Sequence, residues 1–339
     1  MKILFMGDLH YGVAQDDPWI QNIQRDSAKQ IIAYCKKHKI KKGIQFGDWF
    51  DVRKAVTHVT MEFTREIVGM FKEAGIELIT LVGNHDMHFK NKIHPNSATE
   101  LLTQHDNITV IDKPTTLDFD GCLVDIVPWL CQENTEEILN HVKTSSAEIC
   151  IGHWELNGFY FYKGMKSHGL EPDFLKKYKK VYSGHFHTIS KAGNVEYIGT
   201  PYSITAGDED DPRGVWIFDT KTHKTEFVQN ETMWHKKVFY PGQINFDDYK
   251  NLAVRLVVNK IDDKLTEFES NLERVVHSLR VLSNGTIDGP EIDEDSEVEV
   301  ESLDDLIKSY IYAIDGLSEE ECDKVYQYAL SLKVEASSL

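Results

Sequence analysis

The sequence lacks the features that mark secreted, membrane-spanning and thiolate-metal proteins. Its five cysteines are an odd number and are scattered without a CxxC pair, which argues against a disulfide framework or a zinc ribbon and fits a reducing compartment. No apolar run approaches the roughly 18 residues of a membrane span, and the first residues show no signal-peptide pattern. We therefore expect an intracellular, cytoplasmic protein with no membrane attachment.

Basic residues are also scarce. The chain has 37 Lys and Arg against 55 Asp and Glu, so its formal net charge is −18. Such acidity disfavours nucleic acid as a partner without excluding it. Ten of the acidic residues fall between residues 286 and 305, where there is no Lys or Arg. This composition predicts a linker over 284–301, which either is a plain solvated connection or repels or gates a polyanion.

What the chain does contain is ample material for a folded core, with 41% hydrophobic and 11% aromatic residues among 339. At roughly 150 residues per domain, this length suggests about two domains. Apolar strands at 2–7, 43–47 and 77–83 alternate with amphipathic helices at 17–38 and 61–74. Strands dominate after that opening. The pattern predicts an α/β beginning that continues into a β-rich second half.

Four segments follow from these patterns. We expect a first domain over 1–235, a small αβ module over 240–283, the acidic linker, and a short helical pair over 302–339. In the module, AVRLVV at 253–258 predicts a strand, and the apolar residues from Leu265 to Leu279 predict one helix. The terminal pair has one apolar stripe per helix, so it either packs on its own domain or docks on another chain.

Five segments repeat one design, in which an apolar strand ends at a glycine and a metal-binding type of side chain follows. The glycine lets the backbone turn sharply, and side chains two residues apart in extended chain lie on the same side. Strand ends that converge at one sheet edge can therefore pool carboxylates, an amide oxygen and imidazoles, a set suited to Mn, Fe or Zn. The segments are Gly7-Asp8 with His10, Gly47-Asp48, Gly83-Asn84, Gly152-His153, and Gly184-His185 with His187.

Each segment alone has an ordinary explanation, because an aspartate after a strand is often only a turn former. The seven candidate ligands together are too many for one ion and suit two ions, if Asp48 is shared. Two metals about 3.5–4 Å apart can clamp a phosphoryl group and activate a water. The combination therefore predicts a two-metal centre for phosphoester chemistry.

With their neighbouring residues, these segments resemble the calcineurin-like metallophosphoesterase superfamily over residues 1 to about 230. The matching runs are Asp8-Leu9-His10, Gly47-Asp48-Trp49-Phe50-Asp51, Gly83-Asn84-His85-Asp86, Gly152-His153 and Gly184-His185-Phe186-His187. Within the superfamily the chain is similar to SbcD-type nuclease subunits of double-strand-break repair complexes. It most resembles the recombination endonuclease subunits of T-even-type bacteriophages, including VRKAVTH at 52–58 and the stretch 152–175.

The resemblance implies an α/β fold of four αββα layers with a small αβ capping domain, a C-terminal helical hairpin and two divalent metal ions, usually manganese. One metal would be held by Asp8, His10, Asp48 and His187. The other would be held by Asp48, Asn84, His153 and His185. His85 would be the catalytic histidine near the leaving oxygen. Asp51 matches the aspartate that orients this histidine, where archaeal relatives of the nuclease have a histidine.

The resemblance also implies partners. The cap at 240–283 would grip DNA, and the hairpin at 302–339 would bind the coiled-coil root of an SbcC-type ATPase. Helices 18–38 and 61–74 would form a homodimer within a heterotetramer, in the host cytoplasm if a phage encodes the chain. No GxxxxGK[ST] pattern occurs, so any use of ATP depends on the partner.

Candidate substrate contacts are fewer. They are Arg53, in the VRKAVTH stretch, and Tyr160, Tyr162 and Lys163, in an aromatic loop after His153. That loop either packs internally or forms a wall beside the metals that stacks on a frayed DNA end.

Three functions remain open at this point. The first is a manganese-dependent DNA exonuclease and endonuclease that acts with the ATPase in recombination and double-strand-break repair. The second is a stand-alone small-molecule phosphodiesterase or nucleotidase, which would use the same metals. The third is a non-catalytic scaffold, against which the complete ligand set argues. The cap and the helical tail favour the first over the second, because a free-standing phosphatase needs neither.

Overall fold

The computed structural model describes residues 1–162, 165–167, 169–283, 311 and 325–326. The chain divides into two units, Met1–Gly285 and Thr286–Leu339, and every element named below belongs to the first. The expected acidic linker at 284–301, most of the expected hairpin at 302–339, and Lys163 lie outside the described residues. Within the described part, no helix is both long and apolar enough to cross a membrane.

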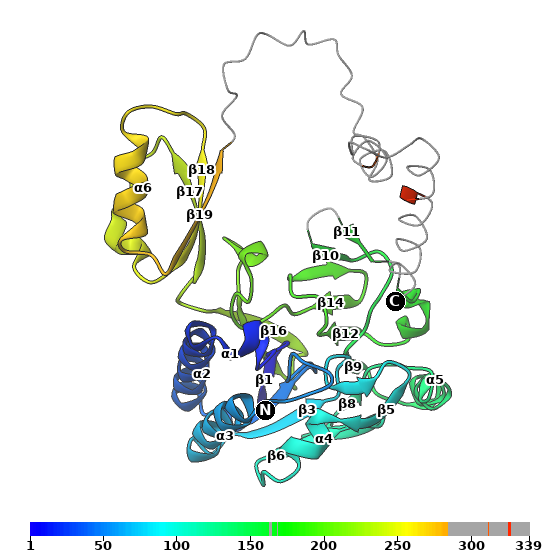
Figure 1. Ribbon diagram of the computed structural model, residues 1–339. Helices are drawn as coiled ribbons and strands as arrows, with labels where there is room; N and C mark the ends of the chain where they lie inside the picture. The colour runs from blue at the N-terminus through cyan, green and yellow to red at the C-terminus, as the bar shows by residue number, and fades with distance from the viewer. Residues whose placement is uncertain (163–164, 168, 284–310, 312–324, 327–339) are drawn as a thin grey trace. The chain divides into compact units, whose positions relative to one another are not determined.

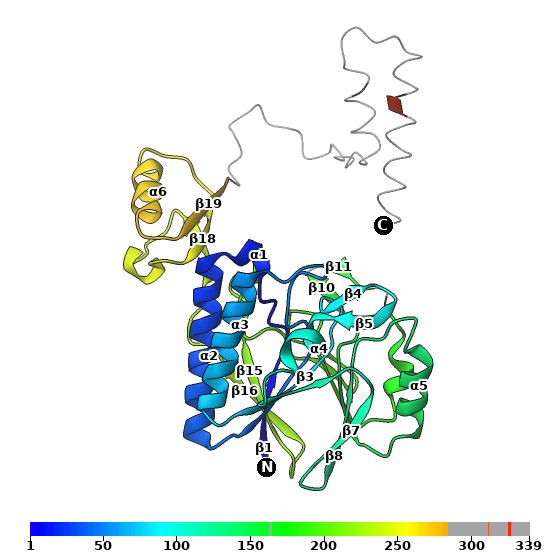
Figure 2. The same cartoon turned by 60° about the horizontal axis from the view of Figure 1, so that its bottom comes forward.

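Six strands form the first sheet, in the order β16-β15-β1-β2-β3-β6. The last four run parallel to one another, and β15 and β16 are added antiparallel. Helices α2 (Pro18–His38) and α3 (His58–Glu73) lie side by side on one face of this sheet (Figures 1 and 2). The strands are β1 (Lys2–Met6), β2 (Lys42–Gln45), β3 (Glu77–Leu81), β6 (Ile108–Ile111), β15 (Gly214–Asp219) and β16 (Lys224–Gln229).

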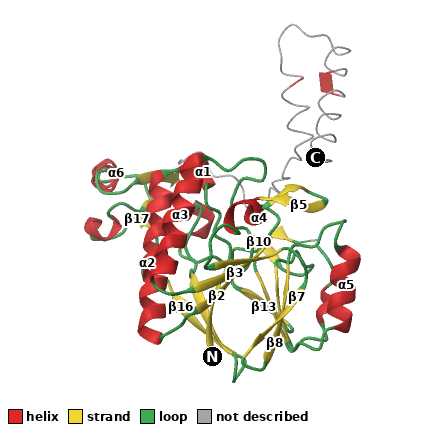
Figure 3. Cartoon of the chain, turned by 90° about the horizontal axis from the view of Figure 1, so that it is seen from below, coloured by secondary structure: helices red, strands yellow, loops and turns green. Residues whose placement is uncertain are grey.

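A second six-stranded sheet has the order β13-β14-β12-β9-β8-β7. Its four central strands, β14, β12, β9 and β8, are parallel, and the two outer strands are antiparallel to their neighbours. Helix α5 (Thr135–Thr144) covers the outer face of this sheet (Figure 3). The strands are β7 (Thr115–Phe119), β8 (Cys122–Val127), β9 (Ile149–Gly152), β12 (Lys180–Ser183), β13 (Ser190–Ala192) and β14 (Val195–Tyr197).

The alternation of side chains along β1 explains how the layers stack. Ile3 and Phe5 pack between the two sheets, in a cluster with strand residues of the second sheet such as Ile149. Leu4 and Met6 point the other way, into the core beneath α2 and α3. All four β1 side chains are at most 2% exposed, so both faces of the sheet are buried. The four-layer αββα sandwich is therefore confirmed.

Short elements connect the strands of the sandwich and of the small sheet that follows it. The most relevant here is the hairpin of β4 (Met87–Phe89) and β5 (Lys92–Asn96), which directly follows β3 and leads into α4 (Ser97–Leu102). The sequence patterns did not reveal this hairpin. The other short elements are α1 (Val13–Asp16), β10 (Tyr160–Tyr162), β11 (Met165–Lys166) and three 3₁₀ helices, Pro172–Leu175, Ala206–Asp208 and Phe246–Tyr249.

A three-stranded parallel sheet with one helix follows the sandwich. It consists of β17 (His235–Tyr240), β18 (Ala253–Val258), α6 (Leu265–Glu273) and β19 (Ser278–Ser283). The sheet begins at His235, before the expected start of the cap at residue 240. The expected single helix from Leu265 to Leu279 is wrong at its end. Helix α6 ends at Glu273, and Leu279 lies in β19 opposite Val254.

Aromatic and ionic contacts join this small sheet to the sandwich. The Trp19 ring stacks on His277 with 4.3 Å between centroids, and its Nε1 donates to the Asn251 carbonyl at 2.9 Å. Glu209, in the loop before β15, accepts ion pairs from Lys237 at 2.9 Å and Arg255 at 2.7 Å. These contacts connect the loop before β15, in the sandwich, to strands β17 and β18 of the small sheet.

Candidate metal centre

The seven predicted ligands come together where strands of both sheets end. All except His185 and His187 are buried. Their side chains form two groups whose nitrogen and oxygen atoms converge. Asp8 and His10 follow β1, Asp48 follows β2, Asn84 follows β3, His153 follows β9, and His185 and His187 follow β12.

The first group consists of Asp8, His10 and His187, whose ligand atoms all lie within 4.8 Å of one another. The Nε2 atoms of the two histidines are 3.1 Å apart. The Asp8 Oδ2 atom is 3.9 Å from the first of these nitrogens and 3.8 Å from the second. Without metal, one of these nitrogens donates its hydrogen to the other. If both are unprotonated, a cation between them can use both as ligands. The group thus fits one divalent ion.

The second group consists of Asp48, His153 and His185, with Asn84 beside them. His153 Nε2 lies 3.1 Å from Asp48 Oδ2 and 3.0 Å from Asn84 Oδ1. The same amide oxygen lies 3.0 Å from His185 Nδ1. Carboxylate, amide oxygen and imidazole without thiolate form a set for Mn, Fe or Zn, so this group also fits a divalent ion.

Asp48 is the residue that connects the two groups. Its Oδ2 atom lies 3.1 Å from His153 in the second group and 3.8 Å from His10 Nε2 in the first. Its other oxygen, Oδ1, accepts the backbone N–H of His85 at 2.7 Å. The carboxylate is 1% exposed. This position between the groups is the one that a bridging ligand would occupy.

His85 is held at the edge of the centre through its own ring and backbone. Its Nδ1 lies 2.6 Å from the Asp51 backbone carbonyl. Because a carbonyl can only accept, Nδ1 carries the hydrogen and Nε2 is left to exchange a proton. The rings of His10 and His85 meet edge-on, with 4.8 Å between their centroids. His85 is thus oriented beside the first ligand group.

The structure changes the expected role of Asp51. The group that orients His85 is the backbone carbonyl of Asp51, whereas its carboxylate lies 3.1 Å from His10 Nδ1. A carboxylate on one ring nitrogen fixes the histidine tautomer and raises the basicity of the other nitrogen, as beside many metal-bound histidines. Asp51 therefore holds His85 through its backbone carbonyl, and its carboxylate lies beside His10. The sequence alone could not distinguish backbone from side chain.

Asp86 is a site residue to which the sequence analysis gave no role. It is fully buried and accepts the backbone N–H groups of Asp48 at 3.0 Å, Phe50 at 3.1 Å and Gly83 at 2.9 Å. Its carboxylate therefore ties the loop after β2 to the loop after β3. The signal was present in the run Gly83-Asn84-His85-Asp86, but nothing in the pattern indicated backbone donors as the partners.

Two glycines allow this close approach of loops. A Cβ atom at position 83 would meet Asp48 Oδ1 at 2.2 Å, and one at position 184 would meet Asp8 Oδ1 at 2.6 Å. Such distances are below any normal contact, so a side chain at either position would displace a predicted ligand. The glycines in the repeated design are thus required for space as well as for turning the chain.

Burial and the crowding of charges shift the titration of the ligands. Burial raises the pKa of Asp8 to about 6, with the negative charge of Asp48 adding to the effect and His153 opposing it. Burial would lower the pKa of His153, but the charges of Asp48 and Asp8 outweigh it and raise this pKa to about 9. The pKa of Asp48 is held well below its usual range by the imidazoles of His153 and His10, against the effect of burial. In the metal-free chain these charges therefore favour an ion pair between Asp48 and His153.

We expect metal binding to displace protons from this pair. A ligand nitrogen must be unprotonated, and the His153 imidazole keeps its proton up to a pKa of about 9. Between pH 7 and 9 the affinity for Mn²⁺ should therefore rise by about tenfold per pH unit, and below pH 6 protonation of Asp8 should make the fall steeper. Calorimetric titration with Mn²⁺ in two buffers of different ionisation enthalpy measures the released protons. An affinity that is constant from pH 7 to 9 would contradict this.

Arg213 is a second residue that the sequence patterns missed. Its side chain is 2% exposed, and its Nη1 donates to the His187 backbone carbonyl and to Thr200 Oγ1. Its Nη2 pairs with Asp208 at 2.8 Å and Asp211 at 2.9 Å. The guanidinium therefore holds the backbone of the predicted ligand His187 in place. An arginine in a loop gives no sequence signal for such a role.

Replacing Arg213 with alanine should lower the free energy of unfolding by about 3–5 kcal/mol, because it leaves the buried Asp208 carboxylate without its counter-charge. The backbone N–H groups of Ile204 and Thr205 would still donate to that carboxylate. The substitution should also weaken metal binding through His187. Urea denaturation of the metal-free protein and a Mn²⁺ titration measure the two effects. Lys236→Ala is the control, since its ion pair with Asp210 is substantially exposed and should contribute at most about 1 kcal/mol. Equal losses in both variants would exclude the anchoring role.

The candidate substrate contacts are less fully described. Arg53 lines a cavity of about 250 Å³ together with residues of the β4–β5 hairpin and α4. The backbones of Tyr160 and Tyr162 form β10, which pairs with β11, and Lys163 lies outside the described residues.

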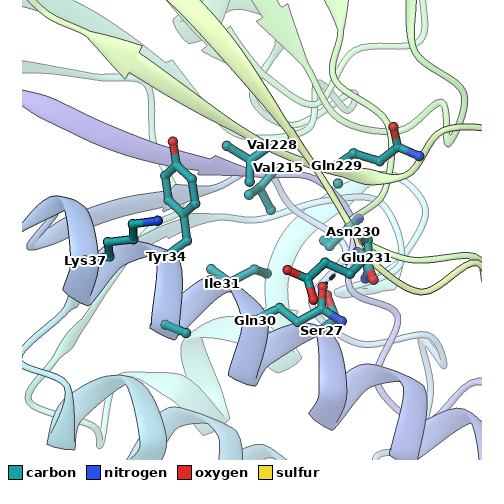
Figure 4. A pocket seen from close by; sticks show the side chains of 13 residues that line it. Ser27, Gln30, Ile31, Tyr34, Lys37, Val215, Val228, Gln229, Asn230 and Glu231 are labelled. Carbon is teal, nitrogen blue, oxygen red and sulfur yellow. Dashed lines mark hydrogen bonds between the residues drawn. The ribbon is translucent and has the colours of Figure 1, made fainter.

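A separate cavity of about 310 Å³ lies between α2 and strands β15 and β16, and Tyr34 and Lys37 lie along it (Figure 4). None of the predicted site residues lines that second cavity.

Comparison with known proteins gives an independent result. A model of the calcineurin-like phosphoesterase family matches residues 1–188. The chain is 61% identical over 340 residues to exonuclease subunit 1 of Enterobacteria phage T4, covering 99% of this chain and 100% of the relative. A solved structure of GAP50, the anchor in the inner membrane complex of Plasmodium, is 12% identical, with a TM-score of 0.40 over 70% of this chain and 90% of that one. That last likeness is too slight to carry an argument.

Proposed function

Because the chain belongs to the calcineurin-like phosphoesterase family and is a metal-dependent phosphoesterase, we propose that it is the nuclease subunit of a DNA-processing complex. It would hydrolyse DNA phosphodiesters as an exonuclease and endonuclease in recombination and double-strand-break repair. The full-length similarity to an exonuclease subunit supports this substrate. The observation that carries the proposal is the Asp48 carboxylate, which lies between two converging ligand groups with His85 beside them.

We assign one ion to Asp8, His10, Asp48 and His187, and the other to Asp48, Asn84, His153 and His185. Two divalent ions, which the family resemblance suggests are Mn²⁺, would supply positive charge for the phosphoryl oxygens and an activated water. His85 keeps its Nδ1 hydrogen on the Asp51 carbonyl. As an imidazolium, protonated also at Nε2, it would pass the Nε2 proton to the departing oxygen and return to the neutral ring. Asp86 and Arg213 keep the loops that present the ligands in register.

The second candidate, a small-molecule phosphodiesterase or nucleotidase, would use the same side chains. The cap-like sheet from β17 to β19, joined to the sandwich through Trp19 and Glu209, favours a substrate larger than a nucleotide. The deciding experiment compares linear duplex DNA with p-nitrophenyl phosphate derivatives, with Mn²⁺ and with or without the partner. Hydrolysis of the small esters alone would favour the second candidate.

For partners, we propose an SbcC-type coiled-coil ATPase, DNA, and a second copy of this chain within a heterotetramer, the copies meeting through α2 and α3. The word "subunit" in the name of the T4 relative is consistent with an assembly. Tyr160, Tyr162 and Lys163 stay proposed DNA contacts, and the segments 240–283, 284–301 and 302–339 stay the proposed cap, linker and ATPase-binding hairpin.

Deleting residues 302–339 should leave the manganese-dependent activity of the isolated chain nearly unchanged. Helices this short are not stable alone in water, and an amphipathic pair gains stability by docking its apolar stripes on another surface. The deletion should abolish co-purification with the ATPase and any stimulation by ATP. Misfolding of the truncated chain, or loss of its basal cleavage, would place the hairpin in the catalytic body instead.

A further inference from the structure

The β4–β5 hairpin presents an exposed aromatic side chain close to the catalytic loop. Phe89 is 47% exposed, and its ring meets that of His88 edge-on, with 4.6 Å between centroids. It follows His85 by four residues, so the two Cα atoms are at most about 14 Å apart. A single exposed aromatic is ordinary on a protein surface. Any function of Phe89 must therefore be inferred from the residues around it.

The hairpin is anchored to the metal centre at its base. Ser97, just after β5, donates its backbone N–H to the Asp86 carbonyl at 2.8 Å and its hydroxyl to the same oxygen at 3.2 Å. The Asp86 side chain in turn binds the backbone of Asp48. Ile93 donates its N–H to Glu133 at 2.9 Å, which fixes the other side of the hairpin. The hairpin that carries Phe89 is therefore hydrogen-bonded, through Ser97 and Asp86, to the loop that contains the predicted ligand Asp48.

Basic and acidic side chains both surround the hairpin, in a chain whose net charge is −18. Glu133 and Asp112 contact it at Ile93 and His94, and cations lie at its tip and beside the neighbouring cavity. Lys90 and Lys92 are exposed at its tip. Beside it lies the cavity of about 250 Å³, to which Arg53, Lys54 and His88 contribute, with Glu100 as the one acidic side chain in its lining. Arg53 follows Asp51 by two residues, so both walls of this cavity start from residues of the metal centre. Positive charge next to a site for phosphoester cleavage suits a phosphodiester strand.

We propose that Phe89, Arg53 and Lys54 form a subsite for one unpaired nucleotide of a DNA strand next to the scissile phosphate. The base stacks on the Phe89 ring, and the adjoining phosphate lies against the two cations. Stacking on an aromatic ring tolerates every base, as a nuclease without sequence preference requires. This inference deepens the proposed function and rests on it.

The first test compares Phe89→Ala, Phe89→Leu and Phe89→Tyr on duplex DNA with frayed ends and on bis-p-nitrophenyl phosphate, both with Mn²⁺. Phe89→Ala and Phe89→Leu should raise the KM for DNA by about 5- to 100-fold and leave hydrolysis of the small diester unchanged. Phe89→Tyr, which keeps the ring, should behave as the unaltered chain. Leu139→Ala on α5, where Leu139 is 41% exposed, is the matched control and should change neither substrate.

A second readout does not require cleavage. A single strand that carries 2-aminopurine at its end should lose fluorescence on binding to the unaltered chain and to Phe89→Tyr in EDTA, and should not do so with Phe89→Ala. If the unaltered chain cleaves no DNA, the proposed function fails while this readout still tests the subsite.

Three results would overturn the subsite. The first is normal binding and cleavage of DNA by Phe89→Ala. The second is normal binding and cleavage by Phe89→Leu, which lacks the aromatic ring. The third is an equal effect of these substitutions on DNA and on the small diester. Normal DNA handling together with lost co-purification of the ATPase would instead make the hairpin a protein contact.

Discussion

His85→Gln should lower the rate of phosphodiester cleavage by about 10²–10⁴-fold while leaving the metal content nearly intact. The residue follows the predicted ligand Asn84, and its ring Nδ1 hydrogen-bonds to the Asp51 carbonyl. Its ring also converges with His10 and Asp51 in a third group of possible ligand atoms, so the metal content has to be measured together with the rate. Its backbone N–H, which binds Asp48 Oδ1 at 2.7 Å, is kept in the variant. The variant therefore loses proton transfer to the leaving oxygen and the ring's hydrogen bond to the Asp51 carbonyl, while all seven predicted ligands are kept.

Initial rates on linear duplex DNA, together with elemental analysis of bound Mn²⁺, measure the two parts of this prediction. His58→Gln is the control, because His58 is exposed at the start of α3 and should leave both unchanged. Cleavage by His85→Gln within a few-fold of the unaltered chain would remove His85 from the mechanism. Loss of metal together with activity would make it a ligand instead.

Asp48→Ala should have the largest effect, a fall in cleavage on the order of 10³-fold or more. Its carboxylate is the only predicted ligand whose oxygen lies near both His10 and His153, so neither ion keeps its full set when it is removed. The variant also leaves the His85 backbone N–H without its acceptor. We therefore expect weaker metal binding and a displaced loop around His85.

The number of Mn²⁺ ions bound per chain, measured after equilibrium dialysis, separates a bridging ligand from a terminal one. Asp173→Ala is the control, because Asp173 is 73% exposed and pairs only with Lys176 on a surface turn. It should bind the same number of ions as the unaltered chain. Two tightly held ions in Asp48→Ala would contradict the bridging assignment.

The strand ends that carry the site could be predicted because local sequence determines them. An apolar strand, a glycine and a polar ligand are visible at β1, β2 and β3 without any knowledge of packing. The structure brings the side chains that follow them within 3–4 Å of histidines from the second sheet. The residues missed act through groups that a pattern does not reveal. Asp86 binds backbone N–H groups, and Arg213 holds a backbone carbonyl.

Helix α6 shows why periodicity alone misplaced an element. The apolar residues at 265, 268, 272, 275, 276 and 279 keep a helical spacing throughout, yet the helix ends at Glu273. Beyond it, the His277 N–H binds the Leu252 carbonyl and Leu279 pairs with Val254 in a parallel strand. Pairing with β18 across the sheet overrides the local helical preference, and such a distant partner is not visible in a single window of sequence.

The central claim is that this chain hydrolyses DNA with metal ions held by the ligands around Asp48. The most direct test is a Mn²⁺ titration of the metal-free chain while cleavage of end-labelled linear duplex DNA is followed. The account predicts no cleavage in EDTA and full activity only when about two Mn²⁺ ions are bound per chain. Cleavage in EDTA, full activity with one ion, or hydrolysis of p-nitrophenyl esters without any cleavage of DNA would contradict it.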